Sequence, residues 1–112
     1  MSRARQKGTS FEVAFLKYCQ ENGFPEASRT EFSSALGDIK GLPITLECKN
    51  QRTMNLPEWL AQVKKSSDKT GLPGGVAHKR LRANIAKTYI TFEADQIIPL
   101  LAELAHLRRL NN

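Results

Sequence analysis

The segment from Ile44 to Lys49 constrains the fold of this chain more than any other segment. Apolar residues at positions 44, 46 and 48 alternate with polar residues at positions 45, 47 and 49. A period of two is typical of a β-strand that turns one face to an apolar core. Glu47 and Lys49 therefore project from the same face of the predicted strand, and Cys48 projects from the other.

Helical patterns flank this strand. Thr9 and Glu12 have the spacing of a capping box, which predicts a helix from Thr9 to about Asn22 with Phe11 and Phe15 on its buried side. Two more helices are expected at about 55–67 and 95–109, and short strands at 27–32, 38–41, 75–79 and 88–92. This order predicts an α/β fold in which helices flank a mixed β-sheet.

The length and charge of the chain narrow the class of protein. Its 112 residues are expected to form a single domain, 1–112, that begins with a short basic arm at residues 1–7. Lys and Arg number 17 against 11 Asp and Glu, which gives a formal net charge of +6. This excess favours a polyanionic partner such as nucleic acid, although a basic protein without such a partner has the same composition.

The two cysteines, Cys19 and Cys48, are too few for a disulfide framework and do not form a CxxC zinc motif. Both fall in segments with apolar periodicity, so we expect reduced core residues. No secretory apolar segment follows Met1, and no apolar run reaches the ~18 residues of a membrane span. A cytoplasmic protein is expected, with no membrane partner and no small-molecule cofactor.

Asp38 is the third charged residue of interest, because a hairpin between it and the strand at 44–49 brings it beside Glu47 and Lys49. Two neighbouring carboxylates repel each other unless a cation lies between them. Oxygen ligands suit Mg²⁺, with Mn²⁺ as a substitute, and the backbone carbonyl of Cys48 is a further candidate ligand. Such a metal activates water and stabilises charge on a phosphate, while Lys49 orients or deprotonates the water. The alternative is a solvated face of salt bridges.

The pairs Gly37-Asp38 and Glu47-Cys48-Lys49 resemble the signature of the PD-(D/E)XK nuclease superfamily, with Gly37 in place of its proline. The segment 5–12 is similar to the start of archaeal-type and phage Holliday-junction resolvases. The resemblance implies a restriction-endonuclease-like core in αβββαβ order. It also implies a phage-like or mobile-element-like, metal-dependent DNA endonuclease that resolves four-way junctions by paired nicks.

The same resemblance assigns roles to further residues. Glu12 corresponds to an additional acid of the active site and metal centre, although as part of a capping box it could serve only the helix. Gln62 lies where many members carry a glutamine after the strand, so it joins the catalytic candidates. Arg29 and one of Ser33 and Ser34 correspond to the arginine and serine that precede the aspartate and contact DNA.

Basic residues outside this motif form clusters that suit phosphate contacts. No recognition helix or zinc finger is visible, so recognition of DNA shape is expected rather than of sequence. The candidate DNA contacts are Arg3, Arg5 and Lys7, then Lys64 and Lys65, then Lys79, Arg80 and Arg82.

Cutting a junction symmetrically requires two active sites, which a C₂ homodimer supplies. The apolar last helix could form part of that interface or belong to the core of the monomer. Two other readings stay open: a nuclease of the same fold that acts on flaps or duplex DNA, and a non-catalytic nucleic-acid-binding protein with a degenerate nuclease fold.

Overall fold

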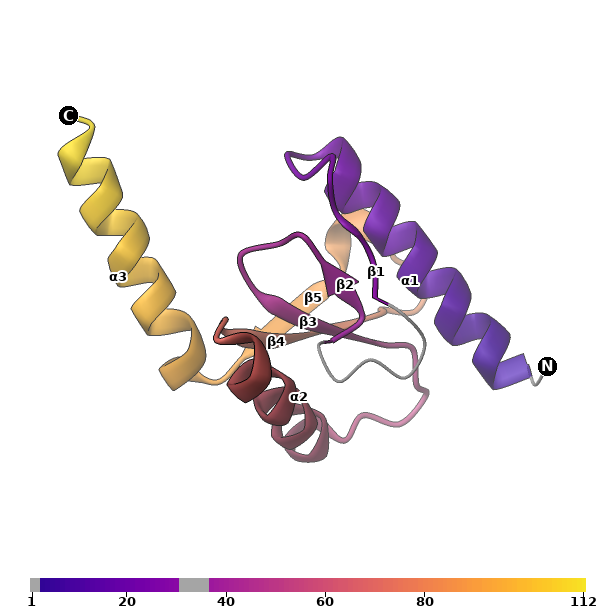
Figure 1. Cartoon of the computed structure of the whole chain (residues 1–112). Helices are drawn as coiled ribbons and strands as arrows, with labels where there is room; N and C mark the ends of the chain where they lie inside the picture. The colour runs from indigo at the N-terminus through magenta and orange to yellow at the C-terminus, as the bar shows by residue number, and fades with distance from the viewer. Residues whose placement is uncertain (1–2, 31–36) are drawn as a thin grey trace.

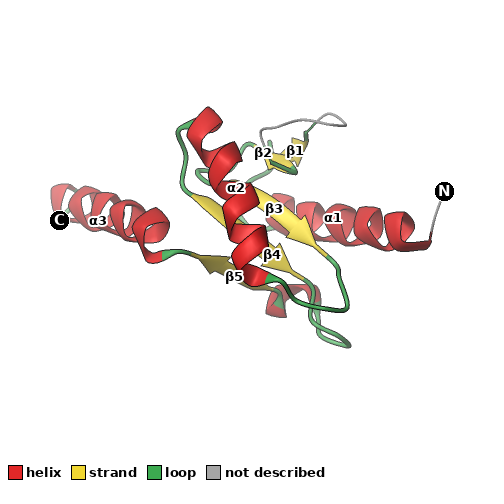
Figure 2. Ribbon diagram, turned by 90° about the horizontal axis from the view of Figure 1, so that it is seen from below, coloured by secondary structure: helices red, strands yellow, loops and turns green. Residues whose placement is uncertain are grey.

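A mixed sheet with one helix on each face forms the body of the protein (Figures 1 and 2). The computed structural model describes the backbone of residues 3–30 and 37–112 and the side chains of residues 10–30 and 37–112. In chain order the elements are α1 (Arg3–Glu21), β1 (Ser28–Arg29), β2 (Ile39–Lys40), β3 (Thr45–Lys49), α2 (Leu56–Thr70), β4 (Gly74–His78), the 3₁₀ turn η1 (Ile85–Lys87), β5 (Tyr89–Phe92) and α3 (Ala94–Leu110).

The five strands follow one another across the sheet in the order β1-β2-β3-β4-β5. Only β3 and β4 are parallel, and α2 makes the crossover between them, as parallel neighbours require. The other neighbouring pairs are antiparallel. The predicted α/β class with a mixed sheet is therefore confirmed, as is the hairpin that joins Asp38 to the strand at 44–49, since Ile39 pairs with Leu46.

The core has two parts because each face of the sheet packs against a different helix. Phe11 and Phe15 of α1 pack with Leu46 and Ala77 on one face. Trp59 and Val63 of α2 pack with Val76 on the other.

Both faces of β3 are consequently covered at its start, where Thr45 and Leu46 are each buried. Thr45 is therefore buried although it lies on the polar face of the strand. The crossover places α2 over that face, where the hydroxyl of Thr45 is hydrogen-bonded to that of Thr70.

The first helix begins at Arg3 instead of Thr9. Residues 3–7 of the expected basic arm are therefore helical, and Thr9 lies inside the helix, so the predicted capping box was wrong. The physical reason is that no residue between Arg3 and Thr9 ends a helix. Gly8 lowers helix stability by about 1 kcal/mol relative to alanine without stopping the helix.

Other element bounds differ by a few residues. The strands β1 and β2 are shorter than the ranges 27–32 and 38–41, of which residues 31 and 32 lie outside the described part of the chain. The helix expected at 55–67 extends to Thr70 and ends at Gly71, whose φ of 76° is the left-handed conformation typical of a helix C-terminus.

The last helix, α3, has the predicted range but projects away from the body (Figure 1). None of its residues is buried. Its first turn is attached through Gln96, whose Oε1 accepts hydrogen bonds from Ser67 Oγ at 2.9 Å and from the backbone N–H of Gly74 at 3.0 Å. Of the two roles open to this helix, membership of the monomer core was wrong. Within the described residues, no helix combines the length and apolar character that crossing a membrane requires.

Gly75 provides a test of how closely β4 and β5 pack. A Cβ at this position would lie 2.5 Å from Cε1 of Phe92, its partner on β5. We expect Gly75→Ala to lower the free energy of unfolding by about 1–3 kcal/mol, because the ring must move. In a Phe92→Leu background the loss should be smaller, as measured by urea unfolding of all four variants. Equal losses in both backgrounds would contradict the contact.

Candidate active site

Asp38 is fixed against β3 by hydrogen bonds from both its backbone and its side chain. Its N–H donates to the carbonyl of Leu46 at 2.7 Å, and its Oδ2 accepts from the N–H of Cys48 at 2.6 Å. The preceding Gly37 has a φ of 91°, and a Cβ there would lie 3.0 Å from the carbonyl oxygen of Leu46. A glycine is thus the residue that allows the chain to approach β3 closely enough for Asp38 to reach Cys48.

The backbone carbonyl of Cys48 is directed to the same side as Asp38. In an extended strand the N–H and C=O of one residue leave the backbone on the same side, and this side alternates along the strand. The N–H of Cys48 is donated to Asp38, whereas the carbonyl of the next residue, Lys49, accepts from Lys79 beyond β4. The Cys48 carbonyl oxygen is therefore directed to the side on which the Asp38 carboxylate lies.

Glu47 projects from β3 toward α2, where its Oε1 accepts a hydrogen bond from Ser66 Oγ at 3.3 Å. Burial of this carboxylate and the neighbouring negative charge of Asp38 raise the pKa of Glu47 from 4.5 to about 7. Lys49 and the Ser66 hydroxyl oppose the shift without cancelling it. Glu47 and Asp38 are therefore close enough for the charge of Asp38 to disfavour ionisation of Glu47.

Lys49 lies on the same face of β3 as Glu47, as the alternation predicted. Its Nζ donates to Oε1 of Gln62 on α2 at 3.2 Å. Gln62 and Ser66 are four residues apart and therefore share one face of the helix. One face of α2 thus holds both charged side chains of β3, with Gln62 on the ammonium and Ser66 on the carboxylate.

Glu12 reaches the same region from α1, on the other side of the sheet. Its Oε2 accepts a hydrogen bond from Arg29 Nη2 at 2.8 Å, and the two form an ion pair. Burial and the charge of Asp38 raise the pKa of Glu12, while Arg29 acts in the opposite direction. Since the capping box does not exist, the alternative role for Glu12 is removed, and its carboxylate is a neighbour of Asp38.

The donor set at this point is the Asp38 and Glu47 carboxylates with the Cys48 carbonyl. In the described part of the chain, no three or more His, Cys, Asp or Glu side chains are arranged to hold a metal ion together. Mg²⁺ commonly uses only one or two protein carboxylates and keeps several waters, so this oxygen set fits it. The Cys48 thiol is no candidate, because burial raises its pKa well above the ordinary value.

The candidate DNA contacts are dispersed, and several have partners within the protein. Arg29 pairs with Glu12, and Lys64 pairs with Asp68 one helical turn away. The guanidinium of Arg80 stacks on the Tyr89 ring at 4.2 Å from its centroid. Lys65, Lys79 and Arg82 are exposed. Ser33 and Ser34 lie outside the described residues, as do the side chains of Arg3, Arg5 and Lys7.

One basic cluster nevertheless lies at the edge of the sheet where β3 and β4 end, next to the candidate active site. Lys49 pairs with His78 in the parallel ladder, so the ends of β3 and β4 lie side by side. Lys79 follows directly, and its N–H donates to the carbonyl of Lys49 at 3.0 Å. The basic stretch that contains Lys79, Arg80 and Arg82 therefore starts beside the candidate active site.

Sequence reasoning missed Ser66, the partner of Glu47. The signal that could have identified it is its place one helical turn after Gln62, on the buried side of an amphipathic helix. His78 is also buried, but it is hydrogen-bonded to Thr91 at 2.7 Å and packs against Trp59, which supports a structural role.

Comparison of the chain with protein-family models, with curated proteins and with solved structures finds no match. The interpretation of the site consequently rests on its geometry and its chemistry.

The raised pKa of Glu47 predicts a pH dependence of stability. Between 4.5 and about 7 the folded protein keeps a proton that the unfolded chain has released, so the free energy of unfolding should fall as the pH rises through this window. Urea unfolding in EDTA at a series of pH values measures this fall. The Glu47→Gln variant should lack this part of the fall, and two parallel curves would refute the assigned environment.

Proposed function

We propose that this chain is a metal-dependent endonuclease that hydrolyses phosphodiester bonds in branched DNA, with four-way junctions as its substrate. The observation that carries the proposal is the hydrogen bond from the Cys48 N–H to Asp38, which brings Asp38 beside the Glu47-Cys48-Lys49 segment. A surface that served only solvated salt bridges would not need a half-buried carboxylate whose pKa is raised to about 7. Strongly shifted carboxyl groups are characteristic of functional sites.

In this proposal Asp38, Glu47 and the Cys48 carbonyl hold Mg²⁺, with Mn²⁺ as a substitute. The bound ion would stabilise negative charge on the scissile phosphate and acidify the attacking water. Lys49 orients that water or neutralises the charge that develops on the phosphate. Gln62 positions the Lys49 ammonium through its hydrogen bond. Glu12 adds a third carboxylate beside Asp38, and Arg29 balances its charge.

The proposed DNA path follows the edge at which β3 and β4 end. Lys79, Arg80 and Arg82 lie after β4 and supply positive charge next to Lys49. The net charge of +6 supports binding to a polyanion along this path. Two copies related by a two-fold axis would place two such sites on opposite strands of one junction. The cytoplasm is the compartment in which we propose that the protein acts.

The test is a cleavage assay of the whole chain on a synthetic four-way junction, a flap and a linear duplex, each with Mg²⁺ and with EDTA. We expect preferential, Mg²⁺-dependent cutting of the junction. Equal cutting of the linear duplex would refute junction specificity. Binding without cutting in Mg²⁺ or Mn²⁺ would identify a non-catalytic DNA-binding protein instead.

Substitution of the two carboxylates tests the metal site directly. Asp38→Asn and Glu47→Gln should each lower the cleavage rate by at least about 100-fold, since each removes a charged ligand. Binding to the junction, measured in EDTA by a mobility shift, should change little. Glu26→Gln is the matched control, because Glu26 is an exposed glutamate that is not among the residues of the candidate site. Cleavage that stays unchanged in either site variant would refute the assignment.

The bond between Lys49 and Gln62 can be tested separately. We expect Lys49→Ala to lower the cleavage rate by about 10²–10⁴-fold and Gln62→Ala by about 10-fold, because Gln62 acts through the lysine. The double variant should be no slower than Lys49→Ala alone. Losses that multiply would show that the two side chains act independently.

A further inference from the structure

The helix α3 carries an apolar face that is not buried by any other described part of the chain. Its apolar positions recur at intervals of three and four residues, which places them on one side of the helix. Many of these side chains are largely exposed: Ile98 by 58%, Leu101 by 49%, Leu104 by 43% and Leu107 by 48%. A monomeric protein rarely exposes a continuous apolar surface of this extent, so the face indicates a partner.

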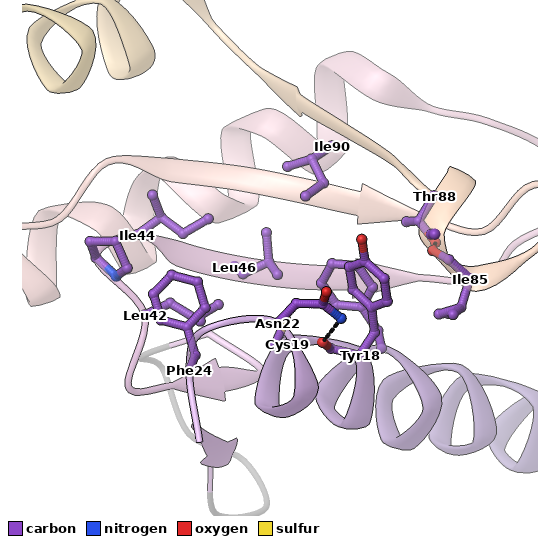
Figure 3. A pocket seen from close by; sticks show the side chains of 13 residues that line it. Tyr18, Cys19, Asn22, Phe24, Leu42, Ile44, Leu46, Ile85, Thr88 and Ile90 are labelled. Atoms are coloured by element: carbon purple, nitrogen blue, oxygen red, sulfur yellow. Dashed lines mark hydrogen bonds between the residues drawn. The ribbon is translucent and has the colours of Figure 1, made fainter. Parts of the chain in front are cut away.

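The body of the protein has an apolar groove on the face of the sheet that α1 covers (Figure 3). Leu46 and Ile44 form its floor, Tyr18 of α1 lies on one side, and Ile90 of β5 lies on the other. The groove has a volume of about 320 Å³. It exists because α1 covers the β2–β3 side of this face, while Ile90 on the edge strand remains 43% exposed.

The α3 helix cannot fill the groove of its own chain. It begins at Ala94, with only Glu93 between it and β5. Its first turn is held by Gln96 to Ser67 of α2 and to Gly74, and α2 covers the face opposite to α1. Turning back to the groove would break both hydrogen bonds and reverse the chain within one residue.

Charge supports the match between helix and groove. Arg108 and Arg109 end α3. Glu21 and Glu26 are exposed and flank the groove residues Asn22 and Phe24 in sequence. Opposite charges at the edge of an apolar contact favour its correct register.

We propose that α3 of one copy docks its apolar face into the α1-side groove of a second copy, and that the second copy does the same in return. The two-fold arrangement makes each copy donate one helix and one groove. A helix of 17 residues is about 25 Å long and about 10 Å wide. One face of it therefore covers much less than the area of about 800 Å² per partner that is typical of a stable interface. The reciprocal exchange makes the contact twice. The inference names the surface through which the two-fold pair of the proposed function assembles, and it does not depend on the chemistry of the metal site.

The test measures the mass of the full chain by size-exclusion chromatography with light scattering over a concentration series. We expect wild type at twice the chain mass of 12.5 kDa. Leu104→Glu on the helix and Ile90→Glu in the groove should each shift the mass to 12.5 kDa. Ala102→Glu, on the side of α3 opposite to Leu104, and Leu81→Glu, with its side chain 88% exposed, are the matched controls and should remain dimeric.

Phe24→Glu is a second groove variant, on the rim opposite to Ile90. It tests the groove independently if Ile90→Glu does not fold. Circular dichroism and thermal melting confirm that each variant is folded. A wild-type chain that is monomeric at every concentration overturns the proposal. Folded groove variants that stay dimeric while Leu104→Glu dissociates would overturn it too, since they indicate pairing of α3 with α3. A monomeric chain would also remove the two-fold pair from the proposed function, but it would leave the metal site untouched. Cleavage by Asp38→Asn and Glu47→Gln tests that site separately.

Discussion

The hydrogen bond from the Cys48 N–H to Asp38 Oδ2 is the contact on which the candidate site depends. It joins the start of β2 to the end of β3 where the regular ladder of the two strands stops at Ile39 and Leu46. Gly37 makes it possible, because its positive φ and missing Cβ allow the backbone to lie against Leu46. Without it, Glu47 and Lys49 would be an isolated charge pair on a strand. With it, they belong to a cluster of oxygen atoms that also includes the Cys48 carbonyl.

The negative charges of this cluster exceed the positive charges beside them. Asp38 disfavours ionisation of both Glu47 and Glu12, and burial acts in the same direction. Arg29 and Lys49 offset only part of this cost. The protein therefore keeps several acids together without enough cations of its own to neutralise them. A divalent metal would remove this imbalance, and that is the physical reason for the proposed chemistry.

The protein also exposes two apolar surfaces, which are the face of α3 and the groove on the α1 side of the sheet. Gln96 holds the first turn of the exposed helix α3 on the side of the sheet that α2 covers, whereas the apolar groove lies on the face that α1 covers, so the two do not meet within one chain. The excess of acidic groups and the exposed apolar surfaces are alike in one respect, because residues of the same chain neither neutralise the first nor cover the second. We propose a cation and DNA as the partners of one surface and a second copy of the chain as the partner of the other.

The sequence by itself determined the α/β class, the strand β3 and the shared face of Glu47 and Lys49, because periodicity acts locally and a strand must alternate. It also indicated the hairpin that brings Asp38 near. It did not determine that α1 begins at Arg3, since a local cap at Thr9 competes with continuation of the helix. Only the tertiary structure decided that α2 places Gln62 against Lys49 and Ser66 against Glu47, that Arg29 pairs with Glu12, and that α3 leaves the core. Each of these depends on contacts between residues distant in sequence, which no local pattern encodes.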